Sequence, residues 1–329
     1  MRRAARAMLL LLVLGLPVAC EPTPTLGQPN SPTPDVTPAS VQPLSTAPAV
    51  TPTPTATLST PRPNPTPQQD NVIIIYHPAY LRVYSTEPAS ETGRIESILK
   101  EIEGVPGFIF TRPDAATEEQ ILAVHTQNRL DNVKLLGPSL YETALLSAGG
   151  AILASEVAMA GQVSMAINRP PGHHASPDTS WGYCYFNNVA VAIVNLLNEG
   201  KIKTALIVDF DLHFGDGLQT IFDKPDNDDP RVTYYHTPTA EGRIYQLQDL
   251  EAFLSQKRGY DIIAVSAGFD AGKLDWGKIF EIQDYTTMGM MIKKAAERNC
   301  GGRRFAVLEG GYNNDVLVKN VKAFLDGFR

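Results

Sequence analysis

Residues 70–329 of this sequence predict one α/β domain with three layers, α/β/α, around a mostly parallel central sheet. Three observations predict it. Short runs rich in Val and Ile recur along this part of the chain, helical patterns alternate with them, and polar residues directly follow several runs. A signal segment at residues 1–20 and a disordered linker at residues 21–69 are expected to precede the domain.

The apolar runs are expected to form strands, because continuous Val/Ile-rich segments suit a parallel sheet that is buried on both faces. They lie at residues 71–77, 163–168, 204–211, 231–236, 261–268 and 304–310. The clearest helical patterns lie at residues 92–103, 117–130, 140–161, 187–200, 284–298 and 314–328. Since helices alternate with strands, the strands are predicted to run parallel, with helices on both faces.

The N-terminus has the pattern of a signal peptide with a lipobox-like end. Arg2, Arg3 and Arg6 precede the apolar run AMLLLLVLGLPVA, which is short for a membrane span and stops at Cys20. LPVAC is similar to a bacterial lipobox, in which the cysteine carries the lipid. We therefore expect an extracytoplasmic lipoprotein tethered to the membrane; plain secretion and an uncleaved anchor are the alternatives.

Residues 21–69 are rich in Pro and Thr and hold fourteen of the 26 prolines. Such a composition cannot bury enough apolar surface to offset the entropy of ordering, so this linker is expected to stay disordered. The net charge of −7 argues against nucleic acid as a partner, because nucleic-acid binding needs a basic face. Three cysteines are too few for a disulfide framework.

Reactive side chains follow four of the predicted strands. RPPGHHA follows residues 163–168, the strand at 204–211 runs into DLHFGD, GFDAG follows 261–268, and GGYNN follows 304–310. Ligands of parallel α/β sheets bind beyond the carboxyl ends of the strands. These segments therefore predict one active site at that edge of the sheet.

A metal site is predicted from Asp211, His213 and Asp270. Residues i and i+2 at a strand end project from the same face, so Asp211 and His213 can ligate one ion. Asp270 can supply a third ligand from another strand. Three protein ligands leave a position for water, as in catalytic zinc sites. The alternative is that both aspartates merely cap helices.

Two adjacent histidines, His173 and His174, follow a PPG turn and are free for proton transfer. Asp209 and Asp216 flank the metal motif, and a carboxylate bonded to one imidazole nitrogen fixes its tautomer and raises its basicity. Two such pairs in different surroundings can act as a base and an acid. Alternatively, one histidine packs in the turn and the other is solvated.

Tyr312 follows two glycines, which allow the backbone to approach a pocket closely. Its phenol can donate a hydrogen bond to a developing oxyanion. Taken alone, this pattern is also that of an ordinary loop with a surface tyrosine.

RPPGHHA, GYCYFNNVAVA, VDFDLHFGDGLQTIF, SAGFDA and LEGGYN together resemble motifs of the histone deacetylase and acetylpolyamine amidohydrolase family, in family order and over about residues 76–329. The resemblance implies the arginase-deacetylase fold and a zinc-dependent deacetylase, with Fe²⁺ as an alternative metal. Because a tethered extracytoplasmic enzyme does not meet histones, we expect a small acetylated amine, such as an acetylpolyamine, or an acetyl-lysine peptide as substrate.

The resemblance also implies a role for each matching residue. The zinc ligands are Asp211, His213 and Asp270. The proton-transfer groups are His173 backed by Asp209, and His174 backed by Asp216, with His174 as the main general base. Tyr312 polarises the acetyl carbonyl. The wall of the acyl-lysine channel is formed by Gly182 and Tyr183.

The sequence departs from the family pattern at three places. Phe214 replaces a second histidine after the metal motif, at a position that is not a ligand. The structural potassium site that the family implies commonly uses a serine where this chain has Tyr234-Tyr235-His236. The sequence therefore does not decide whether this chain has a potassium site. Only residues 237–265 separate His236 from Ser266, so the pocket mouth is expected to be more open than in the family.

Three rival functions stay open at this point. An arginase-like site with two manganese ions would need further carboxylates where this chain has Gly215 and Gly272. A catalytically inactive surface-binding domain would be favoured by loss of a metal ligand or of Tyr312, and none is lost. A de-N-acetylase of envelope sugars would suit the expected location and the open rim.

Overall fold

The computed structural model describes residues 71–224, 227–238, 242–256 and 258–329. The predicted signal segment, its lipobox-like Cys20 and the predicted linker lie outside these residues. Within the described ranges, no helix is both long enough and apolar enough to cross a membrane.

A seven-stranded sheet forms the centre of the domain, and all of its neighbouring strands pair in parallel. Its strands in chain order are β1 (Val72–Ile75), β2 (Phe108–Thr111), β3 (Val163–Ala166), β4 (Ala205–Asp209), β7 (Val232–His236), β8 (Ile262–Ala267) and β9 (Arg304–Leu308). The order across the sheet is β2-β1-β3-β9-β8-β4-β7. The strands that carry reactive side chains, β3, β9, β8 and β4, are therefore consecutive neighbours.

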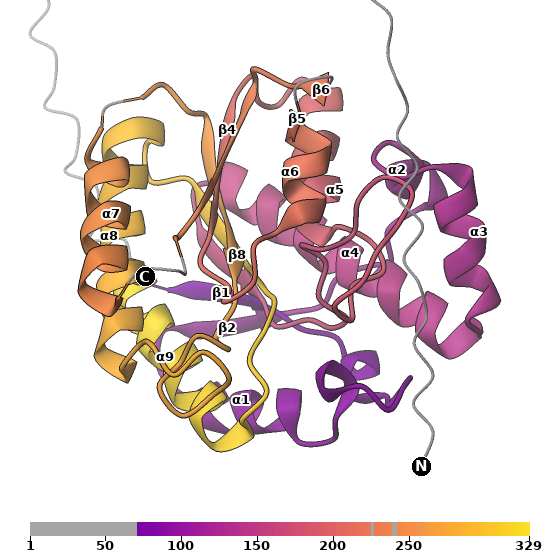
Figure 1. Cartoon of the computed structure of the whole chain (residues 1–329), viewed down its shortest axis with the longest axis horizontal. Coiled ribbons are helices and arrows are strands. Elements are labelled where there is room, and N and C mark those ends of the chain that lie inside the picture. Colours follow the sequence, from indigo (N-terminus) through magenta and orange to yellow (C-terminus); the bar gives the residue numbers. More distant parts are fainter. Residues whose placement is uncertain (1–70, 225–226, 239–241, 257) are drawn as a thin grey trace, which may run out of the picture. The chain divides into compact units, whose positions relative to one another are not determined.

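Helices cover both faces of this sheet (Figure 1). One face packs against α1 (Arg94–Ile102), α7 (Arg243–Ser255), α8 (Ile282–Cys300) and α9 (Asn314–Phe328). The other packs against α2 (Glu118–Leu122), α3 (Gln127–Leu135), α4 (Pro138–Met159), α5 (Asn188–Asn198) and α6 (Asp216–Phe222). The predicted three-layer arrangement is confirmed for the described residues.

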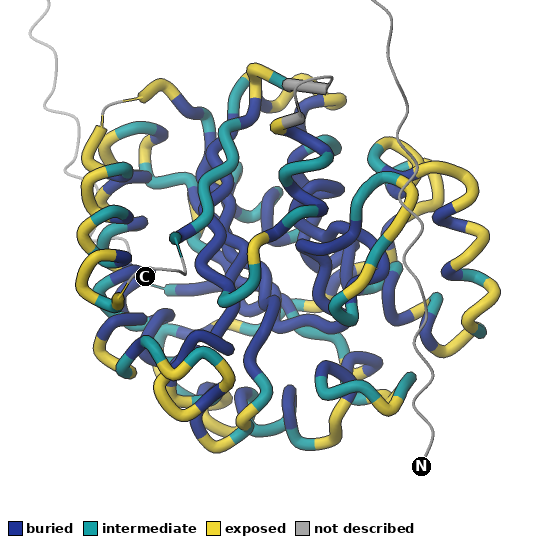
Figure 2. The backbone as a smooth tube through the Cα atoms, viewed as in Figure 1, coloured by how far each residue is buried: buried dark blue, intermediate teal, exposed yellow. Residues whose placement is uncertain are grey.

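Alternate strand residues supply the two hydrophobic cores. Ile74 packs in the core beneath α1, α8 and α9, whereas Ile73 and Ile75 pack in the core beneath α4 and α5. The central strands are dark blue along their length in Figure 2, where dark blue marks buried residues. Burial on both faces explains why these strands read as continuous apolar runs in the sequence.

The structure corrects the predicted helix at residues 117–130, which is two helices. Thr126 caps α3 through its side chain, which accepts the amide proton of Arg129 at 3.1 Å. His125, just before it, is buried: its Nδ1 lies 3.0 Å from the carbonyl oxygen of Ser176, and its Nε2 accepts from Asn187. These long-range bonds break the helix because they hold the chain to the loop that follows β3.

Among the strands of the central sheet and the helices that cover it, β2, α6 and α7 were not predicted. The edge strand β2 has only four residues and leaves Ile109 exposed, so it lacks the long apolar run of the central strands. A short antiparallel pair, β5 (Asp223–Lys224) and β6 (Asn227–Asp228), lies after α6.

Candidate active site

The segments that follow β3, β4, β8 and β9 meet at the carboxyl edge of the sheet. In the register of the sheet, Asp209 at the end of β4 lies opposite Ser266 of β8 and His236 of β7. Because four neighbouring strands end here, the residues that follow them lie close together in space. His173 and Tyr312, for example, are 139 positions apart in the sequence.

Asp211, His213 and Asp270 come together as a candidate metal centre. One possible ligand atom from each lies within 4.8 Å of the others. His213 Nδ1 is 3.2 Å from Asp211 Oδ1 and 2.9 Å from Asp270 Oδ2. Both carboxylates are buried, whereas the His213 side chain is 35% exposed, so the group can be reached from solvent.

The surroundings of these three side chains fit a cation. Asp270 Oδ2 is buried and faces His213 Nδ1, itself a candidate ligand atom, at 2.9 Å, but it accepts no hydrogen bond of regular geometry from the described part of the protein. The neighbouring carboxylates of Asp211 and Asp270 raise the pKa of His213 to about 10, so the group attracts positive charge. Two carboxylates and one imidazole suit Zn²⁺ or Fe²⁺ and leave coordination positions for water and substrate.

Two glycines leave the space that the carboxylates occupy. A Cβ atom on Gly268 would lie 2.0 Å from Asp211 Oδ2, and one on Gly310 would lie 2.5 Å from the same oxygen and 2.7 Å from Asp270 Cγ. The Gly310 amide donates to Asp211 Oδ2 at 2.8 Å. The backbone therefore approaches the metal centre closely because no side chain stands in the way.

The tandem histidines each pair with a different carboxylate. His173 Nδ1 lies 3.2 Å from Asp209 Oδ2, and His174 Nδ1 lies 2.7 Å from Asp216 Oδ1. Both histidines are 3% exposed, and their ring centroids are 4.0 Å apart. Because a carboxylate accepts from Nδ1 in each pair, Nε2 of each ring is left for proton transfer.

The two histidines have opposite proton affinities. Burial lowers the pKa of His173, but the charges of Asp211 and Asp209 outweigh it and raise this pKa well above the usual range. Burial and then the charge of His173 lower the pKa of His174 to about 4. The surroundings thus shift the two pKa values in opposite directions, as expected for two imidazoles with different roles in proton transfer.

Tyr312 stands beside the metal centre on the loop after β9. Burial, followed by the charges of Asp211 and Asp270, raises the pKa of its phenol well above the usual range, so the phenol stays a proton donor. Its ring stacks on Trp276 with a centroid distance of 4.1 Å and meets the edge of Tyr183 at 5.8 Å. Its amide and that of Asn313 both donate to Asp275 Oδ2, which fixes the loop.

Gly182 and Tyr183 lie against the same residues. Gly182 has φ +58°, and a Cβ atom there would lie 2.4 Å from His174 Cδ2. Tyr183 also has a positive φ, 65°, which is costly for a bulky residue. The structure thus places every predicted site residue in one group, with Gly182 against His174 and Tyr183 against Tyr312.

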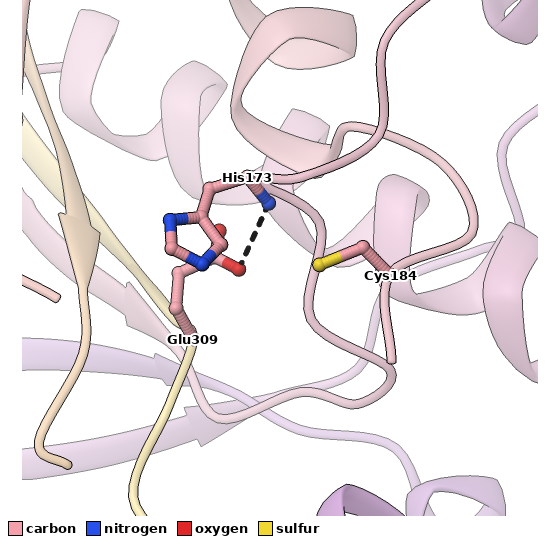
Figure 3. A group of neighbouring side chains, drawn as sticks. All are labelled: His173, Cys184 and Glu309. Atoms are coloured by element: carbon pink, nitrogen blue, oxygen red, sulfur yellow. Dashed lines mark hydrogen bonds between the residues drawn. The ribbon is translucent and has the colours of Figure 1, made fainter. Parts of the chain in front are cut away.

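Glu309 is a site residue that sequence reasoning missed. It is fully buried, and its Oε2 accepts the amide protons of Gly172 at 2.6 Å and His173 at 3.2 Å. Figure 3 shows its carboxylate beside His173 and Cys184, with the His173 bond dashed. Glu309 therefore anchors the loop that carries both histidines. A charged residue inside the apolar run 304–310 was the available signal.

Asp209 and the Asp211 carbonyl oxygen are hydrogen-bonded to residues of β7. Asp209 Oδ2 accepts from the Tyr234 hydroxyl at 3.0 Å, and that hydroxyl accepts from the Gly215 amide at 3.0 Å. His236 Nε2 lies 3.1 Å from the Asp211 carbonyl oxygen. Protein groups therefore hydrogen-bond both the Asp209 carboxylate and the Asp211 carbonyl oxygen, at the place where the sequence leaves the potassium site undecided.

The exposed side of the site is aromatic. Trp181 and Trp276 are 54% and 48% exposed, and Phe214, 43% exposed, packs on Tyr234 and His236. A surface pocket of about 690 Å³ borders Trp276 and Tyr312. This side therefore has room for a ligand that extends beyond the candidate metal centre.

The chain is similar to known proteins over most of its described length. The family model of the histone deacetylase domain matches residues 87–251 and 240–328. A probable deacetylase of Methanothermobacter thermautotrophicus is 31% identical over 308 residues, which cover 78% of this chain and 90% of that protein. A histone deacetylase-like amidohydrolase of Pseudomonas aeruginosa is 30% identical, covering 68% and 71% of the two chains.

The fold is similar to a solved structure as well. The crystal structure of the HDA15 HD domain aligns with a TM-score of 0.66 and 24% sequence identity, covering 78% of this chain and 90% of that one. At that identity the likeness supports the fold.

Proposed function

Because this chain belongs to the histone deacetylase family, we propose that it is a metal-dependent amidohydrolase that removes acetyl or short acyl groups from acylated amines. One observation carries the proposal. The side chains of Asp211, His213 and Asp270 converge within 4.8 Å, beside two imidazoles whose Nδ1 atoms each face a carboxylate. Such a group has the parts needed for hydrolysis: a metal centre, a base and an acid.

In this proposal Asp211, His213 and Asp270 hold the metal ion. When bound, a divalent cation supplies Lewis acidity, which lowers the pKa of a water molecule and polarises an acyl carbonyl. Zn²⁺ is the proposed ion, and Fe²⁺ is the alternative with the same ligand preference.

Protein groups then carry the proton transfers. Nε2 of His174 accepts the proton of the attacking water, and Asp216 on Nδ1 stabilises the imidazolium that results. The Tyr312 phenol donates a hydrogen bond to the carbonyl oxygen as negative charge develops on it. The amide C–N bond breaks, and protonated His173 delivers a proton to the leaving nitrogen. The products are a carboxylic acid and a free amine.

We propose a small acetylated amine or an acetyl-lysine peptide as the substrate. The exposed indole of Trp276, which borders the pocket beside Tyr312, can cover an alkyl chain and attract the positive charge that polyamines and lysine peptides carry. The signal-like residues 1–20 support a location outside the cytoplasm, with a lipid on Cys20 as the tether. Cys20→Ala should move the protein from the membrane fraction to the soluble fraction if the tether is correct.

Acid release from defined substrates tests the function. The full chain, loaded with Zn²⁺ or Fe²⁺, is incubated with an acetylated polyamine, an acetyl-lysine peptide and N-acetylglucosamine oligomers. The proposal expects equal amounts of acetate and amine from at least one of the first two, and loss of both with His174→Ala. Acetate from the sugar alone would transfer the function to envelope sugars, and acetate from none would refute amide hydrolysis.

A further inference from the structure

The two histidine–aspartate pairs are held in different ways. Asp209 is fully buried, and protein groups occupy both of its oxygens, since Oδ1 accepts the Asp211 amide proton and Oδ2 contacts His173 and Tyr234. The side chain of Asp216 is 47% exposed. An exposed carboxylate can rotate or bond to water, so burial alone does not keep Asp216 on His174.

Trp181 supplies the missing contact to Asp216. Its indole Nε1–H donates to Asp216 Oδ2 at 2.8 Å, while His174 Nδ1 lies 2.7 Å from Asp216 Oδ1. Each carboxylate oxygen therefore has one ring N–H donor. Hydrogen bonds to a charged acceptor are stronger than neutral ones, and two donors at fixed positions leave the carboxylate one orientation.

The same indole also packs on the base. The ring centroids of Trp181 and His174 are 3.8 Å apart with 32° between the planes. Trp181 is itself 54% exposed, so its ring lies between the imidazole and solvent at the mouth. His174 reaches its low exposure of 3% partly through this cover.

The backbone after Trp181 keeps the indole in this place. Gly182 lies so close to His174 that a Cβ atom would be 2.4 Å from the imidazole, and its positive φ turns the chain there. The Cys184 amide donates to the Trp181 carbonyl oxygen at 3.1 Å, which closes the turn. The turn therefore places the Gly182 backbone against the His174 imidazole, and Trp181, the first residue of the turn, covers the same ring.

We propose that Trp181 is a positioning residue for the general base. Through Asp216 and through its own ring face, it holds the His174 imidazole in the orientation and tautomer that leave Nε2 free to accept a proton. This inference rests on the proposed function for its kinetic consequence, whereas the indole–carboxylate bond stands on the structure alone.

Two substitutions separate positioning from substrate contact. Trp181→Phe keeps an aromatic face but removes the donor, and a lost hydrogen bond to a charged group is expected to lower kcat about tenfold. KM for a small acetylated amine should change little. In the background of Asp216→Ala, Trp181→Phe should have no further effect on kcat, because the bond it removes is already absent. Tyr245→Phe, at an aromatic residue 51% exposed on α7, is the control and should behave like wild type.

A second readout does not need activity. The chain has two tryptophans, so an ¹⁵N–¹H spectrum contains two indole signals, with Trp276 as the internal reference. The Trp181 signal is expected to lie downfield and to move upfield in Asp216→Ala, while the Trp276 signal stays in place. An unmoved Trp181 signal would overturn the inference, even if the enzyme is active.

The kinetic outcomes overturn it in other ways. Trp181 would have another role if Trp181→Phe kept the wild-type kcat or only raised KM. The same would follow if Trp181→Phe lowered kcat equally in the wild-type and Asp216→Ala backgrounds. If the metal-loaded wild type releases no acid from any substrate while the indole signal responds to Asp216→Ala, the proposed function fails and the positioning contact stands.

Discussion

Gly310→Ala tests whether the close backbone approach holds the metal ligands in place. The added methyl group would lie 2.5 Å from Asp211 Oδ2 and 2.7 Å from Asp270 Cγ, whereas real Cβ atoms essentially never come closer than 3.0 Å. The carboxylates must therefore retreat by at least 3.0 − 2.5 = 0.5 Å and 3.0 − 2.7 = 0.3 Å. Metal–ligand distances tolerate only about 0.2 Å.

The expected result is a loss of Zn²⁺ affinity of roughly 10- to 100-fold, the range found when the groups that orient metal ligands are changed. Competition between the protein and a chelator of known affinity measures it, and circular dichroism checks that the variant is folded. Gly259→Ala is the matched control, since no atom lies within 4 Å of its Cβ position and neither glycine has a positive φ. A folded Gly310→Ala variant with wild-type Zn²⁺ affinity would refute the steric argument.

Three further predictions concern the residues around this centre. Tyr312→Phe should lower kcat by roughly 10²- to 10³-fold, as loss of one oxyanion donor does, with unchanged Zn²⁺ affinity; a loss below threefold in steady-state assays would contradict this role. Burial raises the pKa of Glu309 from 4.5 to about 7. This carboxyl therefore contributes stability that is complete below pH 4.5 and is lost as pH rises through 7. In urea unfolding, the free energy of unfolding of Glu309→Gln should rise relative to that of wild type by about 3 kcal/mol over this pH window. A difference between the two proteins that does not depend on pH would contradict this prediction. Tyr234→Phe should destabilise the domain by about 1–3 kcal/mol in the same assay, because it removes a donor to Asp209 and the acceptor of the Gly215 amide proton; wild-type stability of this variant would contradict the role of the Tyr234 hydroxyl.

The parts of the site that could be predicted from sequence depend on local rules. Asp211 and His213 could be placed on one face because residues i and i+2 at a strand end share it. Their convergence with Asp270 and the tandem histidines followed from the rule that parallel strands present their carboxyl ends at one edge. The long apolar runs predicted the strands that carry these residues.

What could not be predicted depends on contacts between distant residues. Glu309 accepts the amide proton of Gly172, which lies 137 positions away in the sequence. The Trp181 indole donates to Asp216, which lies 35 positions away. No periodicity encodes such pairs, because they arise when loops close over the finished sheet. His125 interrupted a predicted helix for the same reason, since its partners Ser176 and Asn187 lie far along the chain.

We propose one divalent cation, held by Asp211, His213 and Asp270, for the cleavage of an acylated amine. The most direct measurement determines metal content and acetate release on the same preparation, for wild type and for Asp270→Ala. We expect about one ion per wild-type chain, with acetate and amine formed in equal amounts, and neither bound metal nor acetate release in the variant. Full activity of Asp270→Ala without a bound ion would contradict it.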